Sequence, residues 1–195
     1  PEQREELGFQ ELRNLFSQSQ HGEIALNKAI NGMLETYPPG PVAEYMKTIV
    51  LEEERHIKWF QTFCNTFDDG VLPNRLVEFP DKKEDPTIPM VNFCLAMLLE
   101  AILDYYNRLM TNDERMHPLV RQIHALHHGE ETRHLAFDRG VIQHFLAELE
   151  ENLTPEQMAA ERKEISEFLE GFVEVLHSIF CSKEAYEAAG LENPH

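Results

Sequence analysis

A polar set occurs twice in the sequence, each time on a helical pattern of apolar residues. The first copy is Glu52–His56 and the second is Glu130–His134, and both follow the pattern Glu-Glu-x-Arg-His. About 30 residues before the central Glu of each copy, a single carboxylate interrupts an apolar helical stripe, at Glu23 and at Glu100. The chain therefore contains, twice, a helix with one Glu, a turn, and a helix with Glu-x-x-His.

The spacing of this set predicts a metal site. Residues three apart on a helix project from one face, so the Glu and the His of each Glu-x-x-His can reach one point. Buried carboxylates are costly without a partner, and carboxylates with imidazoles are ligands for pairs of divalent metal ions. A single Glu-x-x-His on an acidic helix means little, and Glu100 alone could be an isolated buried acid; the repeat favours ligation. The predicted ligands are Glu23, Glu53, His56, Glu100, Glu131 and His134.

Apolar residues recur at intervals of three and four, which indicates an all-α protein. We expect one domain over residues 1–195, a four-helix bundle of the ferritin-like kind with one or two additional C-terminal helices. The expected helices are Gln3 to Tyr37, Pro41 to Phe67, Met90 to Thr111, a fourth capped by Asn112 or Asp113 and ending near Asn152, Thr154 to Phe180, and Ser182 to Ala189. The irregular stretch from Asp68 to Pro89 is long enough to cross from one end of a bundle to the other.

His127 lies four residues before Glu131 and seven before His134, on the same helical face. We favour a seventh metal ligand at this position; a substrate contact and a histidine packed beneath the site are the alternatives. Of its neighbours, we expect His128 to be the solvated one.

Other polar residues near the repeat have simpler predicted roles. Three glutamates off the inner stripes are expected to be solvated or in salt bridges: Glu52, Glu54 and Glu130. Arg55 and Arg133 are expected to pair with acidic neighbours, and Asp104 or Asp138 could accept the second N–H of a ligand histidine. The expected wall of the cavity, with an ordinary core role as the alternative, consists of Phe60, Phe93, Met97, Leu103 and Phe137.

Composition limits the function classes. The net charge of −18 argues against a nucleic-acid partner and against an anionic membrane surface. Cys64, Cys94 and Cys181 are too scattered for a disulfide framework or a CxxC metal site. No signal peptide is recognisable, and the longest apolar run, Phe93 to Leu103, contains Glu100 and is too short for a bilayer. We expect a cytoplasmic protein.

The doubled Glu…Glu-Glu-x-Arg-His pattern over about Glu23 to Phe145 resembles the di-iron oxygenases and desaturases of the ferritin-like superfamily. The arylamine N-oxygenases of the p-aminobenzoate type are nearest, because a seventh ligand in that family occupies the place of His127. The acyl-carrier-protein desaturases come next. This chain is shorter than either branch usually is, and it has Glu52 and Glu130 at the start of its sets, where Asp is common in the N-oxygenases.

The resemblance implies a di-iron enzyme that activates dioxygen and oxidises a small organic substrate, with N-oxygenation of an amine as one outcome. The ligands would be the six named above plus His127, and manganese or a mixed manganese–iron pair would use the same ligands. The implied partners are the substrate, dioxygen, an external electron donor and a second copy of the chain. The alternatives are a carrier-bound acyl desaturase, a ferroxidase or iron-handling protein, and a hydrolase. The desaturase would need a local basic patch for its acidic carrier, and Lys82-Lys83 is little evidence for one.

Overall fold

The computed structural model describes residues 2–76, 78–80, 87–180 and 182–191. Its elements are six helices: α1 (Glu2–Leu34), α2 (Pro41–Phe67), α3 (Ile88–Asn112), α4 (Pro118–Asn152), α5 (Pro155–Phe180) and α6 (Lys183–Ala188). Within these ranges there is no strand, so the all-α prediction is confirmed. Cys181 and Lys82-Lys83 lie outside the described residues.

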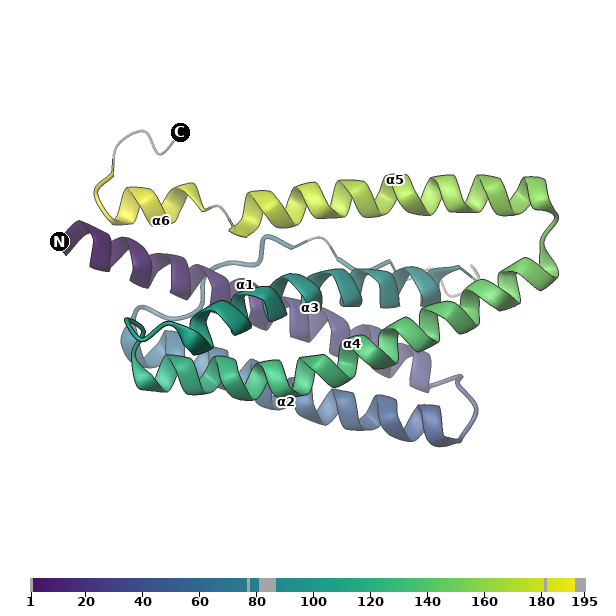
Figure 1. Cartoon of the computed structure of the whole chain (residues 1–195), viewed down its shortest axis with the longest axis horizontal. Coiled ribbons are helices and arrows are strands. Elements are labelled where there is room, and N and C mark those ends of the chain that lie inside the picture. Colours follow the sequence, from purple (N-terminus) through teal and green to yellow (C-terminus); the bar gives the residue numbers. More distant parts are fainter. Residues whose placement is uncertain (1, 77, 81–86, 181, 192–195) are drawn as a thin grey trace.

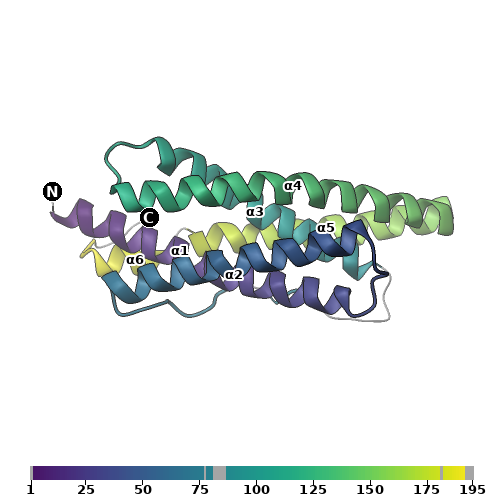
Figure 2. The same ribbon diagram turned by 90° about the horizontal axis from the view of Figure 1, so that it is seen from below.

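The bundle consists of two antiparallel helix pairs. α1 packs against α2, and α3 packs against α4 (Figure 1). Both pairs run along the long axis of the molecule, and α5 returns over α3 on the side away from α2 (Figures 1 and 2). Because α2 and α3 run in the same direction, the connection between them has to cross the length of the bundle, as in ferritin-like folds with one long crossover.

Polar side chains of α1 hold the first part of this crossover. Ser17 accepts a hydrogen bond from the backbone N–H of Leu72 at 3.0 Å, and the Gln18 amide donates to the carbonyl of Pro73 at 3.0 Å. The Arg13 side chain donates to the carbonyl of Gly70, where a φ of +96° favours glycine. The buried polar residues in the first half of α1 therefore replace water for the backbone of an irregular segment.

Helix α3 is the central core helix. Its buried apolar residues include Val91, Leu95 and Leu99, which pack with residues of α1 and α5. Among the described residues it is also the one helix whose length and apolar composition would suffice to cross a membrane, and 56% of that window is buried in the bundle.

The ends of α4 and α5 show how local chemistry sets the helix boundaries. The expected cap of α4 at Asn112 or Asp113 is wrong: α4 begins at Pro118, whose ring fits the first turn, and the His117 ring accepts from the N–H of Leu119 at 3.1 Å. Asp113 instead binds the Arg115 side chain. The predicted capping box before α5 is present, because Thr154 and Gln157 exchange side-chain-to-backbone hydrogen bonds of 3.3 and 3.0 Å.

Candidate metal centre

The seven side chains predicted from the sequence meet inside the bundle. Each is at most 1% exposed, and none faces solvent. Four helices supply them: Glu23 from α1, Glu53 and His56 from α2, Glu100 from α3, and His127, Glu131 and His134 from α4. They form two groups of four that share Glu131, and within each group the potential ligand atoms all lie within 4.8 Å of one another.

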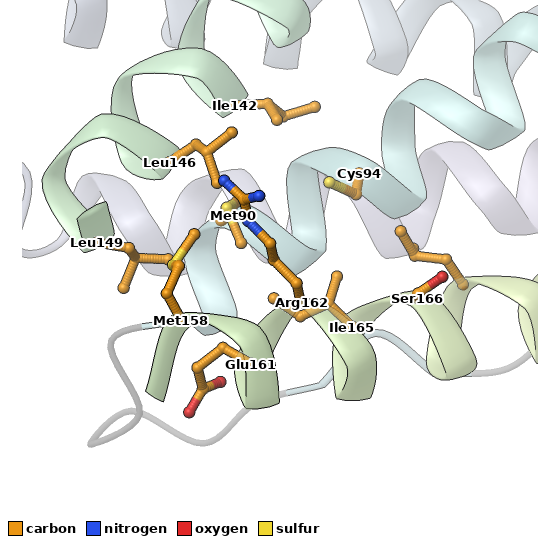
Figure 3. A pocket seen from close by; sticks show the side chains of 11 residues that line it. Met90, Cys94, Ile142, Leu146, Leu149, Met158, Glu161, Arg162, Ile165 and Ser166 are labelled. Atoms are coloured by element: carbon orange, nitrogen blue, oxygen red, sulfur yellow. The ribbon is translucent and has the colours of Figure 1, made fainter. Parts of the chain in front are cut away.

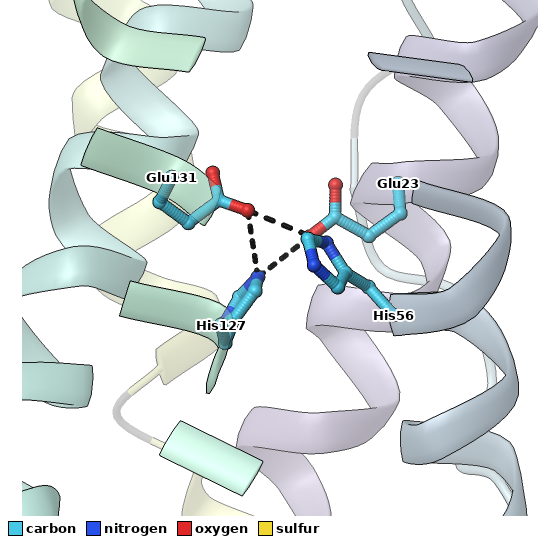
Figure 4. A group of neighbouring side chains, drawn as sticks. All are labelled: Glu23, His56, His127 and Glu131. Atoms are coloured by element: carbon cyan, nitrogen blue, oxygen red, sulfur yellow. Dashed lines mark ion pairs between the residues drawn. The ribbon is translucent and has the colours of Figure 1, made fainter. Parts of the chain in front are cut away.

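The first group contains Glu23, His56, His127 and Glu131 (Figure 4). The Nε2 atom of His127 lies 2.9 Å from Glu131 Oε1 and 3.4 Å from Glu23 Oε1. The Nδ1 atom of His56 lies 3.3 Å from the same oxygen of Glu131. Nitrogen and oxygen atoms from three helices therefore point to one small volume.

The second group contains Glu53, Glu100, Glu131 and His134. The Nδ1 atom of His134 lies 2.8 Å from Glu53 Oε1, 3.9 Å from Glu100 Oε1 and 3.7 Å from Glu131 Oε1. The remaining oxygen of Glu53 lies 2.7 Å from His56 Nδ1, so Glu53 contacts both predicted ligand histidines of the two repeats. Glu53 and Glu131 are thus placed between the two groups.

Burial and crowding perturb these groups in opposite directions. Burial, and next the neighbouring charge of Glu53, raises the pKa of Glu23 to about 8. Burial also disfavours the charged forms of His127 and His134, but the adjacent carboxylates outweigh it and raise the pKa of His127 to about 10 and that of His134 to about 12. Burial would raise the pKa of Glu131, but His127 and His134 lower it overall. Such a concentration of perturbed groups is typical of a functional site.

Several polar atoms at the centre lie close to other polar atoms but make no hydrogen bond of acceptable geometry, which tests whether a metal fits. Buried polar groups in proteins are nearly always satisfied, so each exception needs an explanation. The unsatisfied atoms include both oxygens of Glu23 and of Glu131, one oxygen each of Glu53 and Glu100, and one nitrogen each of His127 and His134. Carboxylate oxygens and imidazole nitrogens directed at common points are the donor set of a pair of divalent transition-metal ions. The residues therefore fit two metal ions.

A glycine beside the first ligand brings α1 close to α3. A Cβ atom at Gly22 would lie 2.3 Å from the Cδ2 atom of Leu99, which is too close for any larger residue without a shift. Gly22 precedes Glu23 and Leu99 precedes Glu100, so this close approach lies directly beside two predicted ligands. Glycine weakens a helix interior by about 1 kcal/mol relative to alanine, and close packing is the compensating reason for it here.

Two of the predicted ligand histidines, His56 and His134, each contact a carboxylate from the opposite repeat. The Nε2 atom of His56 lies 2.8 Å from Glu130 Oε2, and that of His134 lies 2.8 Å from Glu52 Oε2. The other oxygen of each carboxylate accepts from an arginine, from Arg55 for Glu130 at 2.7 Å and from Arg133 for Glu52 at 2.8 Å. A carboxylate at Nε2 holds a hydrogen on that nitrogen and leaves Nδ1 to face the centre.

These contacts correct part of the sequence interpretation. The salt bridges of Glu52 and Glu130 with arginines were predicted, but their contacts with His134 and His56 were not. The brace expected from Asp104 is wrong, because that carboxylate pairs with the half-exposed His128. Asp138 is buried at the side of Glu100, and burial, with repulsion from nearby carboxylates, raises its pKa to about 7. Glu52 and Glu130 are visible in the sequence as the first Glu of each repeat. Their contacts with the histidines, however, depend on how α2 and α4 face each other.

Replacing Glu52 by Gln is expected to weaken binding of the metal held by His134 by roughly 10- to 100-fold, because the imidazole loses the carboxylate that orients it and raises its basicity. The measurement is a titration of the metal-free protein with Mn²⁺ followed by electron paramagnetic resonance. Glu54→Gln is the matched control, since Glu54 lies on the same helix and is exposed. Equal affinities of the two variants would contradict the brace.

An apolar pocket of about 270 Å³ opens between α3, α4 and α5 (Figure 3). Its apolar lining includes Met90, Ile142 and Met158, and Arg162 lies at its side. Cys94 also lines the pocket; burial, and next the charge of Asp138, raises the pKa of this thiol to about 11. None of the seven predicted ligands is among the residues that line this pocket.

Comparison with known proteins places the chain in a family. The family described as P-aminobenzoate N-oxygenase AurF matches it over residues 1–195. The searches of curated proteins and of solved structures gave no match. The match confirms the resemblance to the arylamine N-oxygenases and gives no support to the desaturase branch. The chain belongs to the p-aminobenzoate N-oxygenase AurF family, a family of oxygenases with a ferritin-like fold.

Proposed function

We propose that this protein is a two-iron oxygenase that transfers an oxygen atom from dioxygen to the nitrogen of an aryl amine. The observation that carries the proposal is the convergence of four carboxylates and three imidazoles, with unsatisfied ligand atoms, in two groups that share Glu131. The family supports the oxygenase class and, through it, the amine substrate. The predicted ligands are the seven residues described above, including His127.

The chain's own residues give the site its chemical character. When bound, a pair of irons would supply the redox chemistry that activates dioxygen. The bundle excludes water from the centre, and the braces at Glu52 and Glu130 hold the two imidazoles in a fixed orientation. His127 adds a second imidazole, beside His56, to the group that also contains Glu23 and Glu131.

The overall reaction requires a reductant. Conversion of an aryl amine and one dioxygen to a hydroxylamine and one water consumes two electrons and two protons. A pair of ferrous ions could supply these two electrons once. Every further turnover would require an external electron donor to return the pair to the ferrous state, so such a donor is part of the proposal. A homodimer and a cytoplasmic location also stay predictions.

The decisive experiment is loading with ferrous iron under anaerobic conditions, followed by exposure to ¹⁸O-labelled dioxygen, a chemical reductant and p-aminobenzoate. We expect two irons per chain and mass-spectrometric detection of a hydroxylamine or its oxidised product that carries the label. Two irons with no labelled nitrogen product from any aryl amine would reject N-oxygenation, and a chain that binds no divalent metal would reject the whole proposal.

The apolar pocket is the proposed place for the ring of the substrate. Replacing Cys94 by Phe places a larger side chain in the lining of the pocket and is expected to raise the KM for the aryl amine roughly tenfold, the effect of about one misfitting group in an apolar site. Steady-state kinetics on the iron-loaded protein measures this. Cys94→Ser, which conserves volume, is the control. An unchanged KM in the Phe variant, with metal content retained, would place the substrate elsewhere.

A further inference from the structure

A buried amide connects two histidines of α4 next to the metal centre. Asn107 comes from α3, is 1% exposed and lies between His124 and His127. Its Oδ1 atom lies 2.7 Å from His124 Nδ1 and 3.2 Å from His127 Nδ1, and its Nδ2 atom lies 2.9 Å from the same His127 nitrogen. A single amide therefore presents both an acceptor and a donor to the ring nitrogen of His127 that faces away from the carboxylates.

His124 fixes the orientation of this amide. The Nδ1 atom of His124 contacts the amide oxygen, so that nitrogen carries the hydrogen and donates it. The Nε2 atom of His124 is buried without a hydrogen-bond partner, and the ring packs 5.2 Å from the ring of Phe16. The surroundings of the His124 ring therefore do not stabilise a positive charge on it. His124 is a neutral donor whose contact uses one lone pair of the amide oxygen and leaves the second for His127.

His127 needs this second lone pair if its Nε2 atom is to bind a metal. That Nε2 atom lies 2.9 Å from Glu131 and 3.4 Å from Glu23, so it is the nitrogen that faces the centre. A neutral imidazole has one hydrogen, and an Nε2 that binds a metal places it on Nδ1. The amide oxygen at 3.2 Å can accept that hydrogen, and the amide nitrogen at 2.9 Å can donate to an Nδ1 that carries none. The two contacts therefore correspond to the two tautomers of His127, and only the first leaves Nε2 free for a metal.

We propose that Asn107, held in place by His124, is a positioning residue that keeps the hydrogen of His127 on Nδ1 and so presents a bare Nε2 to the carboxylate centre. This inference rests on the proposed function only in that His127 binds a metal. It assigns a role to two buried residues that the ligand pattern leaves unexplained. It also explains why a polar amide is placed in the interface of α3 and α4.

The test measures the tautomer of His127 directly. Protein labelled with ¹⁵N in its histidine rings and loaded with diamagnetic Zn²⁺ is examined by nuclear magnetic resonance. We expect the hydrogen of His127 on Nδ1 in the wild-type chain and in Asn107→Asp, which keeps an oxygen acceptor. Asn107→Leu, similar in size but without polar atoms, is expected to lose this signature and to bind the metal at the His127 group roughly 10- to 100-fold more weakly.

Asn112→Leu is the matched control, because Asn112 is exposed on the same helix, and both of its properties should equal those of the wild type. A Leu variant at position 107 with unchanged affinity and tautomer would overturn the proposal. If that variant does not fold, the wild-type and Asp spectra still decide: a hydrogen on Nε2 of His127 in either zinc-loaded protein contradicts the role of Asn107. Two bound zinc ions in that case would leave the two-metal proposal standing, which separates the two failures.

Discussion

Replacing Glu131 by Gln is expected to remove both metal ions and to lower the turnover of an aryl amine by at least about 10³-fold, corresponding to roughly 4 kcal/mol of barrier. Glu131 is the one residue common to both ligand groups. Its Oε1 atom lies within 4 Å of the ring nitrogens of three histidines, His56, His127 and His134. An amide has one oxygen and no charge, so it cannot replace a carboxylate shared by two cations.

Metal content by mass spectrometry and product formation are the two measurements for this variant. Glu54→Gln again provides the control, because it makes the same chemical change on an exposed position next to Glu53. Glu23→Gln offers a graded comparison, since Glu23 belongs to the first group only. We expect that variant to lose one metal and keep the other. A Glu131→Gln protein with two metals and normal turnover would rule out the shared carboxylate.

Without metal, the protein is expected to lose stability as the pH rises from 7 to 9. The pKa of Glu23 is raised to about 8 and that of His127 to about 10, so the folded chain holds protons that the unfolded chain releases near pH 4.5 and 6.5. The state that binds more protons is weakened by their removal, so the free energy of unfolding falls with pH in this window. One extra bound proton corresponds to about 1.4 kcal/mol per pH unit, or roughly 3–6 °C in the melting temperature.

Metal binding should remove this dependence. The ligands have then released their protons already, and metal bound to the folded state alone raises the melting temperature by mass action. Thermal melts followed by circular dichroism, with a chelator and with excess Mn²⁺, test both parts. Metal-free Glu23→Gln should show a shallower decline than the wild type, since it lacks one of the titrating groups. A metal-free melting temperature that stays level between pH 7 and 9 would contradict the described crowding of carboxylates.

Much of the fold was predictable because the residues that begin and end its helices act locally. Pro41 and Pro155 mark first turns, and the Thr154 capping box precedes the latter. The beginning of α4 was missed because Asn112 and Asp113 are residue types that often cap helices. Here the Asn112 side chain donates to the carbonyl of Arg108, and the Asp113 side chain accepts from Arg115. Short polar side chains have several local partners, so a cap cannot be assigned from residue type alone.

The sequence by itself determined which side chains could form the centre. The period of an α-helix is fixed, so spacing alone places Glu53 with His56 on one face, and Glu131 with His127 and His134 on another. A carboxylate on an apolar stripe is then directed to the interior, where its desolvation demands a partner.

Only the tertiary structure decided what supports those side chains. Glu52 reaches His134 and Glu130 reaches His56 because α2 and α4 face each other across the bundle, and Asn107 meets His124 and His127 because α3 packs on α4. These contacts join residues far apart in the sequence, and they depend on the rotation of one helix against another. Side-chain packing over the whole interface sets that rotation, and no local pattern encodes it.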